Sequence, residues 1–220
     1  MCMKFFWIRI LNMLAGIILY AFGIAATINA NVGYAPWEVF HAGLADAVGL
    51  SIGAASIISG IAIVAMVTAL GEKLGLGTIA SMILTGVFID AIFTFNMIPR
   101  AENPIIGMIL LITGLFIISI GSYLYIKSAF GVGPRDNLMV VLSRKSNIPV
   151  GACRGIVEAL ATLIGWFLGG TVGIGTIVSA IAAGFCVQIT FWVLKFDVTA
   201  IKHETLGDTY KALVDRRRKT

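Results

Sequence analysis

Two short charged segments carry the residues of this apolar chain that are best suited to bind a ligand. The first places Trp37 and Glu38 directly after a proline, and the second places Arg135 and Asp136 in the same position. Arginine can clamp a carboxylate or a phosphate, and the face of a tryptophan can stack on a ligand or bind a cation. A short helix headed by proline presents free N–H groups that suit an anion. These four residues are therefore a candidate substrate site, although an acid in the first turn of a helix also has a purely structural use.

Four polar residues inside long apolar stretches form a second candidate group: Asp90, Arg154, Glu158 and Gln188. Such residues are costly in lipid, so by default they line a polar cavity or pair with one another in the protein interior. Arg154 and Glu158 are four positions apart, which places them on one helical face as a local ion pair. A proton- or cation-coupling role for Asp90 or Glu158 is the functional alternative.

The sequence lacks the patterns that would indicate an enzyme. It contains no His/Cys/Asp metal constellation, no Gly-x-Ser-x-Gly turn and no Walker loop. The cysteines Cys2, Cys153 and Cys186 are far apart and indicate neither a disulfide framework nor a zinc site. His41 is a single imidazole that we expect near the outer surface, where a lone histidine is usually just a polar residue. We expect no catalytic residue, no metal, no cofactor and no nucleic-acid partner.

The composition is that of a membrane protein. Of the 220 residues 59% are apolar and only 12% are charged, whereas about a quarter are charged in a soluble domain. The mean hydropathy is +0.98. Apolar stretches of about 18 to 22 residues recur, which is enough to cross a hydrocarbon core of about 30 Å. We predict an all-α membrane protein with six spans, at about Ile10–Ala30, Ser51–Leu70, Thr78–Met97, Ile105–Ile126, Val150–Leu168 and Thr176–Leu194.

The chain contains one unit twice, at an ungapped offset of 98 residues. Pro36 falls on Pro134, and the Gly-x-Gly-Thr turn at 75–78 falls on the one at 173–176. These turns lack the spacing and the preceding strand of a dinucleotide site, so we interpret them as tight turns between helices. The second copy begins after a polar break that contains Arg100.

Each copy is predicted to hold three spans and one short helix that begins at the proline. The short helices, at 36–48 and 134–145, are too short to span and are either interfacial or re-entrant. The predicted organisation is an N-terminal repeat (1–98), a linker (99–105), a C-terminal repeat (106–195) and a basic cytoplasmic tail (196–220).

Basic residues are distributed unequally between the two sides of this layout. One side collects nearly all lysines and arginines, including the 216–219 cluster of the tail, while the other keeps only Arg100. By the positive-inside rule both termini are cytoplasmic, and a five-span layout would violate this rule. Three spans per copy make the two copies enter the membrane from opposite sides, which is the inverted-topology repeat of many transporters and channels. The heads of the two short helices would then approach each other near the middle of the membrane.

The motifs resemble those of a known family. The Gly-x-x-Pro-Trp-Glu-Val segment at 33–39, the Gly-x-Gly-Pro-Arg-Asp segment at 131–136, the Gly-x-Gly-Thr turns and the length are similar to the YczE/YyaS/YitT-type family of bacterial integral membrane proteins. The resemblance covers nearly the whole chain except the basic tail. It implies a location in a bacterial cytoplasmic membrane, but it supplies little chemistry, because the family is largely of unknown function.

The sequence favours a small secondary transporter or channel-like permease for an anionic or zwitterionic solute. The site would lie at the repeat interface, between the two short helices. The main alternative is a membrane accessory subunit that positions a partner enzyme or regulator without transport, and a flippase-like activity is a third possibility. The expected partners are membrane lipid and a small solute, with a homo-oligomer or a partner membrane protein as a further option, because abundant small residues permit close helix packing.

Overall fold

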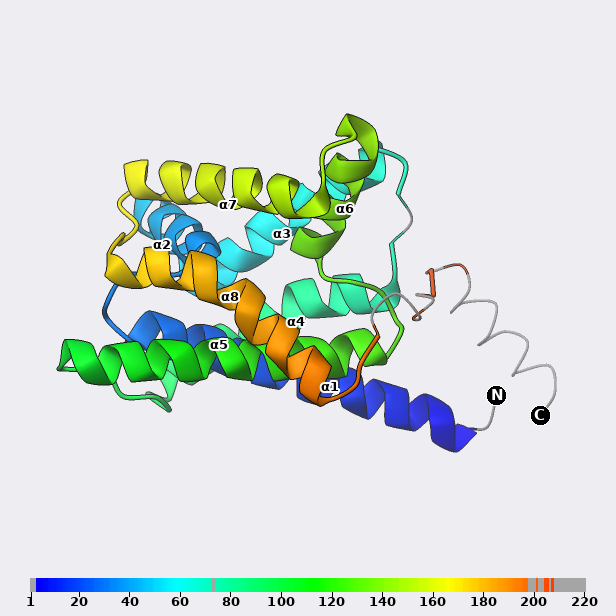
Figure 1. Cartoon of the computed structure of the whole chain (residues 1–220), viewed down its shortest axis with the longest axis horizontal. Helices are drawn as coiled ribbons and strands as arrows, with labels where there is room; N and C mark the ends of the chain where they lie inside the picture. Colours follow the sequence, from blue (N-terminus) through cyan, green and yellow to red (C-terminus); the bar gives the residue numbers. More distant parts are fainter. Residues whose placement is uncertain (1–2, 73, 198–200, 202–203, 206, 208–220) are drawn as a thin grey trace.

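The computed structural model describes residues 3–72, 74–197, 201, 204–205 and 207, and these residues form helices and loops without a strand. Most of the predicted tail (196–220) and Cys2 lie outside the described residues. Eight α-helices are described (Figure 1): α1 (Met3–Asn29), α2 (Pro36–Val48), α3 (Ile52–Ala69), α4 (Leu76–Thr94), α5 (Pro104–Lys127), α6 (Pro134–Ser146), α7 (Val150–Phe167) and α8 (Ile174–Val193).

Five of these helices are long and apolar enough to cross a membrane: α1 from Phe6 onward, α3, α4, α5 and α8. The helix α7 has 18 residues and lies along the long axis of the molecule in Figure 1, but it is not among the five. It carries the charged residues Arg154 and Glu158. The all-helical membrane fold agrees with the sequence analysis, whereas the sixth span remains a prediction.

The helix starts recur at a fixed spacing along the chain. The pairs α2 and α6, α3 and α7, and α4 and α8 each begin 98 residues apart, at positions 36 and 134, 52 and 150, and 76 and 174. Proline fixes two of these starts, because its missing N–H costs nothing at the first position of a helix. Several bounds differ from those expected, most of all at α1, which begins at Met3 rather than near Ile10, and at α4, which ends at Thr94 rather than near Met97. The short helix α6 ends at Ser146 rather than Lys145.

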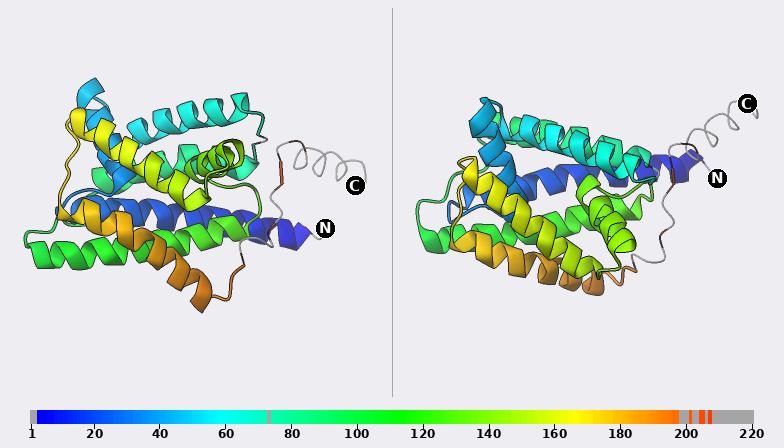
Figure 2. Two further views of the ribbon diagram at one scale, coloured as in Figure 1. Left: turned by 45° about the horizontal axis from the view of Figure 1, so that its top comes forward. Right: turned by 90° about the horizontal axis from the view of Figure 1, so that it is seen from above.

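The long helices α1 and α5 form the centre of the fold. They pack along their length, and they lie side by side in the views of Figures 1 and 2. Small residues allow this approach, because a Cβ at Gly16 would collide with the backbone of Tyr125, and one at Gly121 with the backbone of Tyr20. In Figure 1, α2 lies near one end of the long axis and α6 lies near the other. The start of α1 and the end of α8 are both toward the α6 end.

Each Gly-x-Gly turn docks on a loop of the other copy. The N–H of Gly77 donates to the carbonyl oxygen of Phe130 (2.8 Å), and the N–H of Gly175 donates to that of Val32 (2.7 Å). The Thr78 hydroxyl also donates to the carbonyl oxygen of Val132 (2.7 Å). Both turns therefore hold the chain that leads into the other copy's short helix, and together they position the heads of α2 and α6.

Candidate functional site

Arg135 lies where the two short helices meet. Its Nη1 is 3.4 Å from Oε1 of Glu38, and its Nη2 is 3.3 Å from Nδ1 of His41. The guanidinium also covers the ring of Trp37, with Cζ 4.8 Å from the ring centroid. All three partners belong to the first two turns of α2, whereas Arg135 is the second residue of α6. Three residues of the predicted substrate site are thus in contact across the two copies.

His41 belongs to this cluster and is therefore not the isolated polar residue that we expected. It is 1% exposed, and its Nε2 is 2.9 Å from Oγ of Ser59 on α3. Since the Ser59 hydroxyl donates to the carbonyl oxygen of Ser56 (2.9 Å), Nε2 of His41 donates to Ser59 and His41 is neutral in this arrangement. Nη2 of Arg135 is close to both ring nitrogens, 3.3 Å from Nδ1 and 3.4 Å from Nε2. Burial, and then the positive charge of Arg135, lower the pKa of His41 well below its usual range, which favours this neutral form.

The spacing of His41 from Trp37 and Glu38 is a signal in the sequence that we did not use when we considered His41 as a single residue. Residues three or four apart share a helical face, and His41 follows Glu38 by three positions and Trp37 by four. The position of Ser59 carried no comparable signal, because a single hydroxyl in an apolar span is common.

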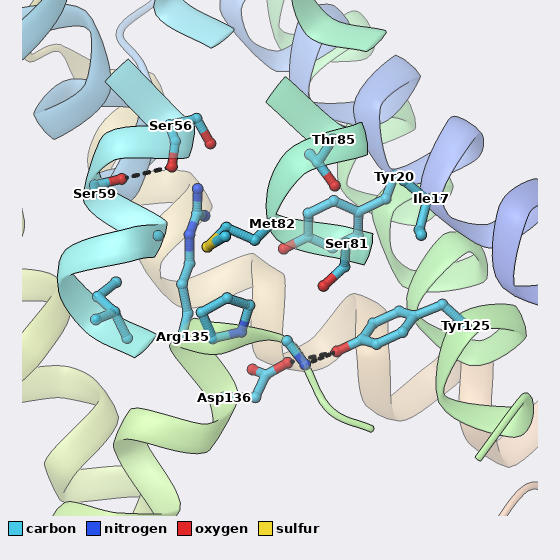
Figure 3. Close-up of a pocket in the computed structure, with 14 residues that line it drawn as sticks. Ile17, Tyr20, Ser56, Ser59, Ser81, Met82, Thr85, Tyr125, Arg135 and Asp136 are labelled. Atoms are coloured by element: carbon cyan, nitrogen blue, oxygen red, sulfur yellow. Dashed lines mark hydrogen bonds between the residues drawn. The ribbon is translucent and has the colours of Figure 1, made fainter. Parts of the chain in front are cut away.

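A cavity of about 60 Å³ opens beside Arg135 (Figure 3). Its lining comes from α1, α3, α4, α5 and α6, so both copies contribute. Hydroxyl groups come from Tyr20, Ser56, Ser59, Ser81, Thr85 and Tyr125, whereas Arg135 contributes a positive charge and Asp136 a negative one. Glu38 and His41 do not line the cavity, so they contact Arg135 from outside it. The Asp136 carboxylate bonds to Tyr125, so the guanidinium of Arg135 and the other hydroxyl groups form the part of the lining that suits a small anion.

Asp136 has a different partner from its neighbour Arg135. Its Oδ2 accepts a hydrogen bond from the Tyr125 hydroxyl (3.4 Å), and that hydroxyl accepts one from the N–H of Gly133. Figure 3 shows the carboxylate directed toward Tyr125 and the Arg135 side chain directed toward Ser56 and Ser59. Asp136 therefore lines the cavity, apart from the cluster of Trp37, Glu38 and His41.

Asp90 and Gln188, which occupy equivalent positions in the two copies, lie away from this cavity. Asp90 Oδ1 accepts from the N–H of Gly53 (2.8 Å), and its Oδ2 accepts from the Ser51 hydroxyl (2.6 Å). A carboxylate at a helix N-terminus is favourable, so Asp90 stabilises the start of α3. Gln188 is exposed on α8.

Arg154 and Glu158 form the local ion pair that their spacing predicted, with Nε 2.8 Å from Oε1. Glu158 also lines a second opening of about 620 Å³ between α7 and α8. The walls of this groove are mainly apolar, with residues such as Ile177 and Ile181, and the groove extends to Pro36 at the head of α2. It therefore ends one residue from Trp37 of the Arg135 cluster.

The two copies differ in the packing of their last two helices. In the first copy α3 packs on α4, whereas α7 packs extensively on α2 and is not among the helices that pack on α8. A Cβ at Gly53 of α3 would collide with the carbonyl oxygen of Gly86 in α4. The equivalent glycines, Gly151 of α7 and Gly184 of α8, would meet no atom within 4 Å. The second copy therefore has glycines equivalent to those that bring α3 and α4 together, but in α7 and α8 these glycines are not in contact.

A different pair of residues explains why α7 lies against α2. Gly43 of α2 and Gly165 of α7 meet at their backbones. The equivalent residues are Val141 of α6 and Val67 of α3, which are both buried. Because valine keeps two helices farther apart than glycine does, α3 packs less extensively on α6 than α7 does on α2.

The long apolar helices, joined by short loops and packed through glycines, define an integral membrane protein that crosses the bilayer several times. A protein family described as a family of unknown function (DUF6198) matches residues 7–191, and the chain belongs to this family.

Curated relatives agree with this assignment. The chain is 35% identical over 181 residues to the uncharacterized membrane protein YczE of Bacillus subtilis, covering 80% of this chain and 82% of YczE. It is 30% identical to an uncharacterized protein of Haemophilus influenzae, covering 76% and 75% of the two chains. It is 25% identical to the uncharacterized protein YyaS of B. subtilis, covering 79% and 88%. The resemblance to the YczE/YyaS-type family is confirmed, and no solved structure matches the chain.

Proposed function

We propose that this protein is a small secondary transporter or channel-like permease for an anionic or zwitterionic solute, which binds in the cavity beside Arg135. The observation that carries the proposal is a guanidinium at the contact between the two copies, 20% exposed and facing a cavity lined with hydroxyls. A subunit that only positioned a partner protein would need no such cavity in its interior. The cavity therefore favours transport over the accessory role.

The volume of the cavity limits the size of the solute. One water occupies roughly 10–15 Å³ by this measure, so a cavity of about 60 Å³ has room for about four waters or about four to five heavy atoms. Formate, acetate, nitrate and glycine are of this size, and each carries an anionic group that an arginine can bind through two parallel hydrogen bonds.

Transport requires a second conformation in which the helices pack differently. The difference in packing between the two copies suggests what that conformation is. In an inverted repeat the two copies exchange their conformations as the site opens to the other side. On this basis α7 leaves α2 and closes on α8 through Gly151 and Gly184. At the same time α3 leaves α4, which separates Gly53 from Gly86. The groove between α7 and α8 would close, and an equivalent groove between α3 and α4 would open.

We further propose six crossings of the cytoplasmic membrane with both termini in the cytoplasm. In a variant without native cysteines, a membrane-impermeant maleimide is expected to label Glu102→Cys in intact cells, because Glu102 is exposed in the loop between α4 and α5. Thr220→Cys in the basic tail should react only after the cells are permeabilised. Efficient labelling of Thr220→Cys in intact cells would overturn this topology.

Uptake into proteoliposomes tests the function directly. Isotope-labelled formate, acetate, nitrate and glycine are offered to vesicles that contain the purified protein, and at least one is expected to enter faster than into protein-free vesicles. Arg135→Gln should reduce that uptake to the protein-free level. Arg144→Gln is the matched control, because Arg144 lies on the same helix but is 64% exposed and pairs with Glu72. The proposal is wrong if none of the four solutes enters, or if uptake survives Arg135→Gln.

A further inference from the structure

We propose that Glu38 couples solute binding to proton uptake. The anion replaces the Glu38 carboxylate as the partner of Arg135, and the released carboxyl group takes up one proton. This inference rests on the anion site proposed above, and it names the coupling ion and the residue that carries it.

The position of Glu38 is unusual for an acid in the first turn of a helix. Such acids are normally solvated, whereas Glu38 is 5% exposed. Its Oε1 is 3.4 Å from Nη1 of Arg135, and strong charge-assisted hydrogen bonds are about 2.7–2.9 Å long. Arg135 is at the same time 3.3 Å from His41. The ion pair is therefore loose, and Arg135 is shared between two partners on α2.

Arg135 lines the cavity, whereas its partner Glu38 does not. A solute in the cavity can therefore reach the same guanidinium without first displacing Glu38 from the lining. Glu38 holds Arg135 through one oxygen. A carboxylate or nitrate in the cavity can use two oxygens on the planar fork, which is the stronger arrangement. The solute can therefore draw Arg135 away from Glu38.

Once Arg135 is withdrawn, little remains to keep Glu38 ionised. The charged residues of α7 are Arg154 and Glu158, which already pair with each other, and α3 and α8 contain no charged residue. On α6, Asp136 bonds to Tyr125 rather than to α2, and the neighbouring His41 is neutral. Burial, the largest influence, raises the pKa of Glu38. Arg135 is the strongest influence that lowers this pKa, the backbone N–H of Glu38 lowers it as well, and Glu158 raises it. Loss of the Arg135 contact therefore favours the neutral acid.

The charges balance in this exchange. One anion enters the cavity with charge −1, and one proton from the adjoining solution converts the Glu38 carboxylate to a carboxylic acid. The complex thus gains no net charge, which lowers the cost of carrying an anion through a low-dielectric interior. Asp90 and Glu158, the coupling acids considered from the sequence, are held by other partners, the start of α3 and Arg154.

Calorimetry of the purified full-length protein in detergent tests the coupling. Sodium nitrate and sodium formate are titrated at neutral pH in two buffers of different ionisation enthalpy, because the difference in heat counts the protons taken up. Both probes are fully ionised at this pH, so any proton must enter the protein. We expect about one proton per bound anion, with binding up to about tenfold tighter for each pH unit of acidification.

The variants locate the proton. Glu38→Gln is expected to bind the same anion with no proton uptake and no pH dependence. Asp46→Asn is the matched control, because Asp46 is an exposed acid on the same helix and should leave proton uptake unchanged. Anion binding by the wild type without proton uptake, or proton uptake that persists in Glu38→Gln, would refute the coupling and leave the anion site intact. If neither anion binds the wild type, both the coupling and the anion site beside Arg135 are wrong.

Discussion

Replacing Gly53 with alanine is expected to destabilise the protein by about 1–3 kcal/mol, whereas the same change at Gly151 is expected to be neutral or stabilising by up to about 1 kcal/mol. A Cβ at Gly53 collides with the backbone of Gly86, which cannot move without separating α3 from α4. A Cβ at Gly151 meets nothing within 4 Å, so only the higher helix propensity of alanine remains. Unfolding of the two purified variants in detergent measures the difference.

Transport gives the second readout for the same pair. If α7 closes on α8 during transport, Gly151→Ala introduces there the collision that Gly53→Ala introduces now, and it disfavours that state by a similar free energy. Uptake should then fall about tenfold or more, since about 1.4 kcal/mol corresponds to a factor of ten. Full uptake by a well-folded Gly151→Ala variant would contradict the proposed closure of α7 on α8.

The combined variant Arg135→Gln with Glu38→Gln is expected to be more stable than Arg135→Gln alone. Removing only Arg135 leaves the buried Glu38 carboxyl group without its partner, so Glu38 must either stay charged in the interior or take up a proton, and the resulting loss of stability is at most about 3–5 kcal/mol. The amide that Glu38→Gln introduces carries no charge and needs no proton, so the combined variant avoids this cost and most of the lost stability should return. Thermal unfolding of both variants measures this recovery.

Measurements of anion binding distinguish the role of Arg135 in stabilising the fold from its role in binding the solute. Neither the single nor the combined variant should bind nitrate or formate, because both lack the guanidinium. A combined variant that is stable and still binds the anion would mean that Arg135 serves the fold alone.

Much of the fold follows from the sequence because its signals are local. Apolar runs predict the long helices, and the prolines at 36 and 134 predict where the short ones begin. The sequence predicts that the two helix heads approach each other and leaves both Asp136 and Glu38 as partners for Arg135, since a single sequence contains no information about side-chain distances. The cavity was not predictable, because its hydroxyls come from four helices and appear in the sequence as isolated polar residues.

The unequal packing of the two copies could not be predicted from their matching sequence patterns. Gly53 and Gly151 match in the alignment of the two copies, yet only Gly53 is in close contact. The explanation lies at another pair of positions, where Gly43 and Gly165 meet while the first copy has a valine at position 67. Matching residues show that two segments can pack alike, but the balance of competing contacts decides whether they do.

The docking of the Gly-x-Gly turns determines how the chain can be assembled. The loop before α2 is held by Gly175, which is synthesised more than 140 residues after Val32, and the loop before α6 is held by Gly77. The head of each short helix is thus completed by residues of the opposite half. The first half cannot reach its final form while the second is still on the ribosome, although its apolar helices can already enter the bilayer. The duplicated halves therefore form one interlocked folding unit.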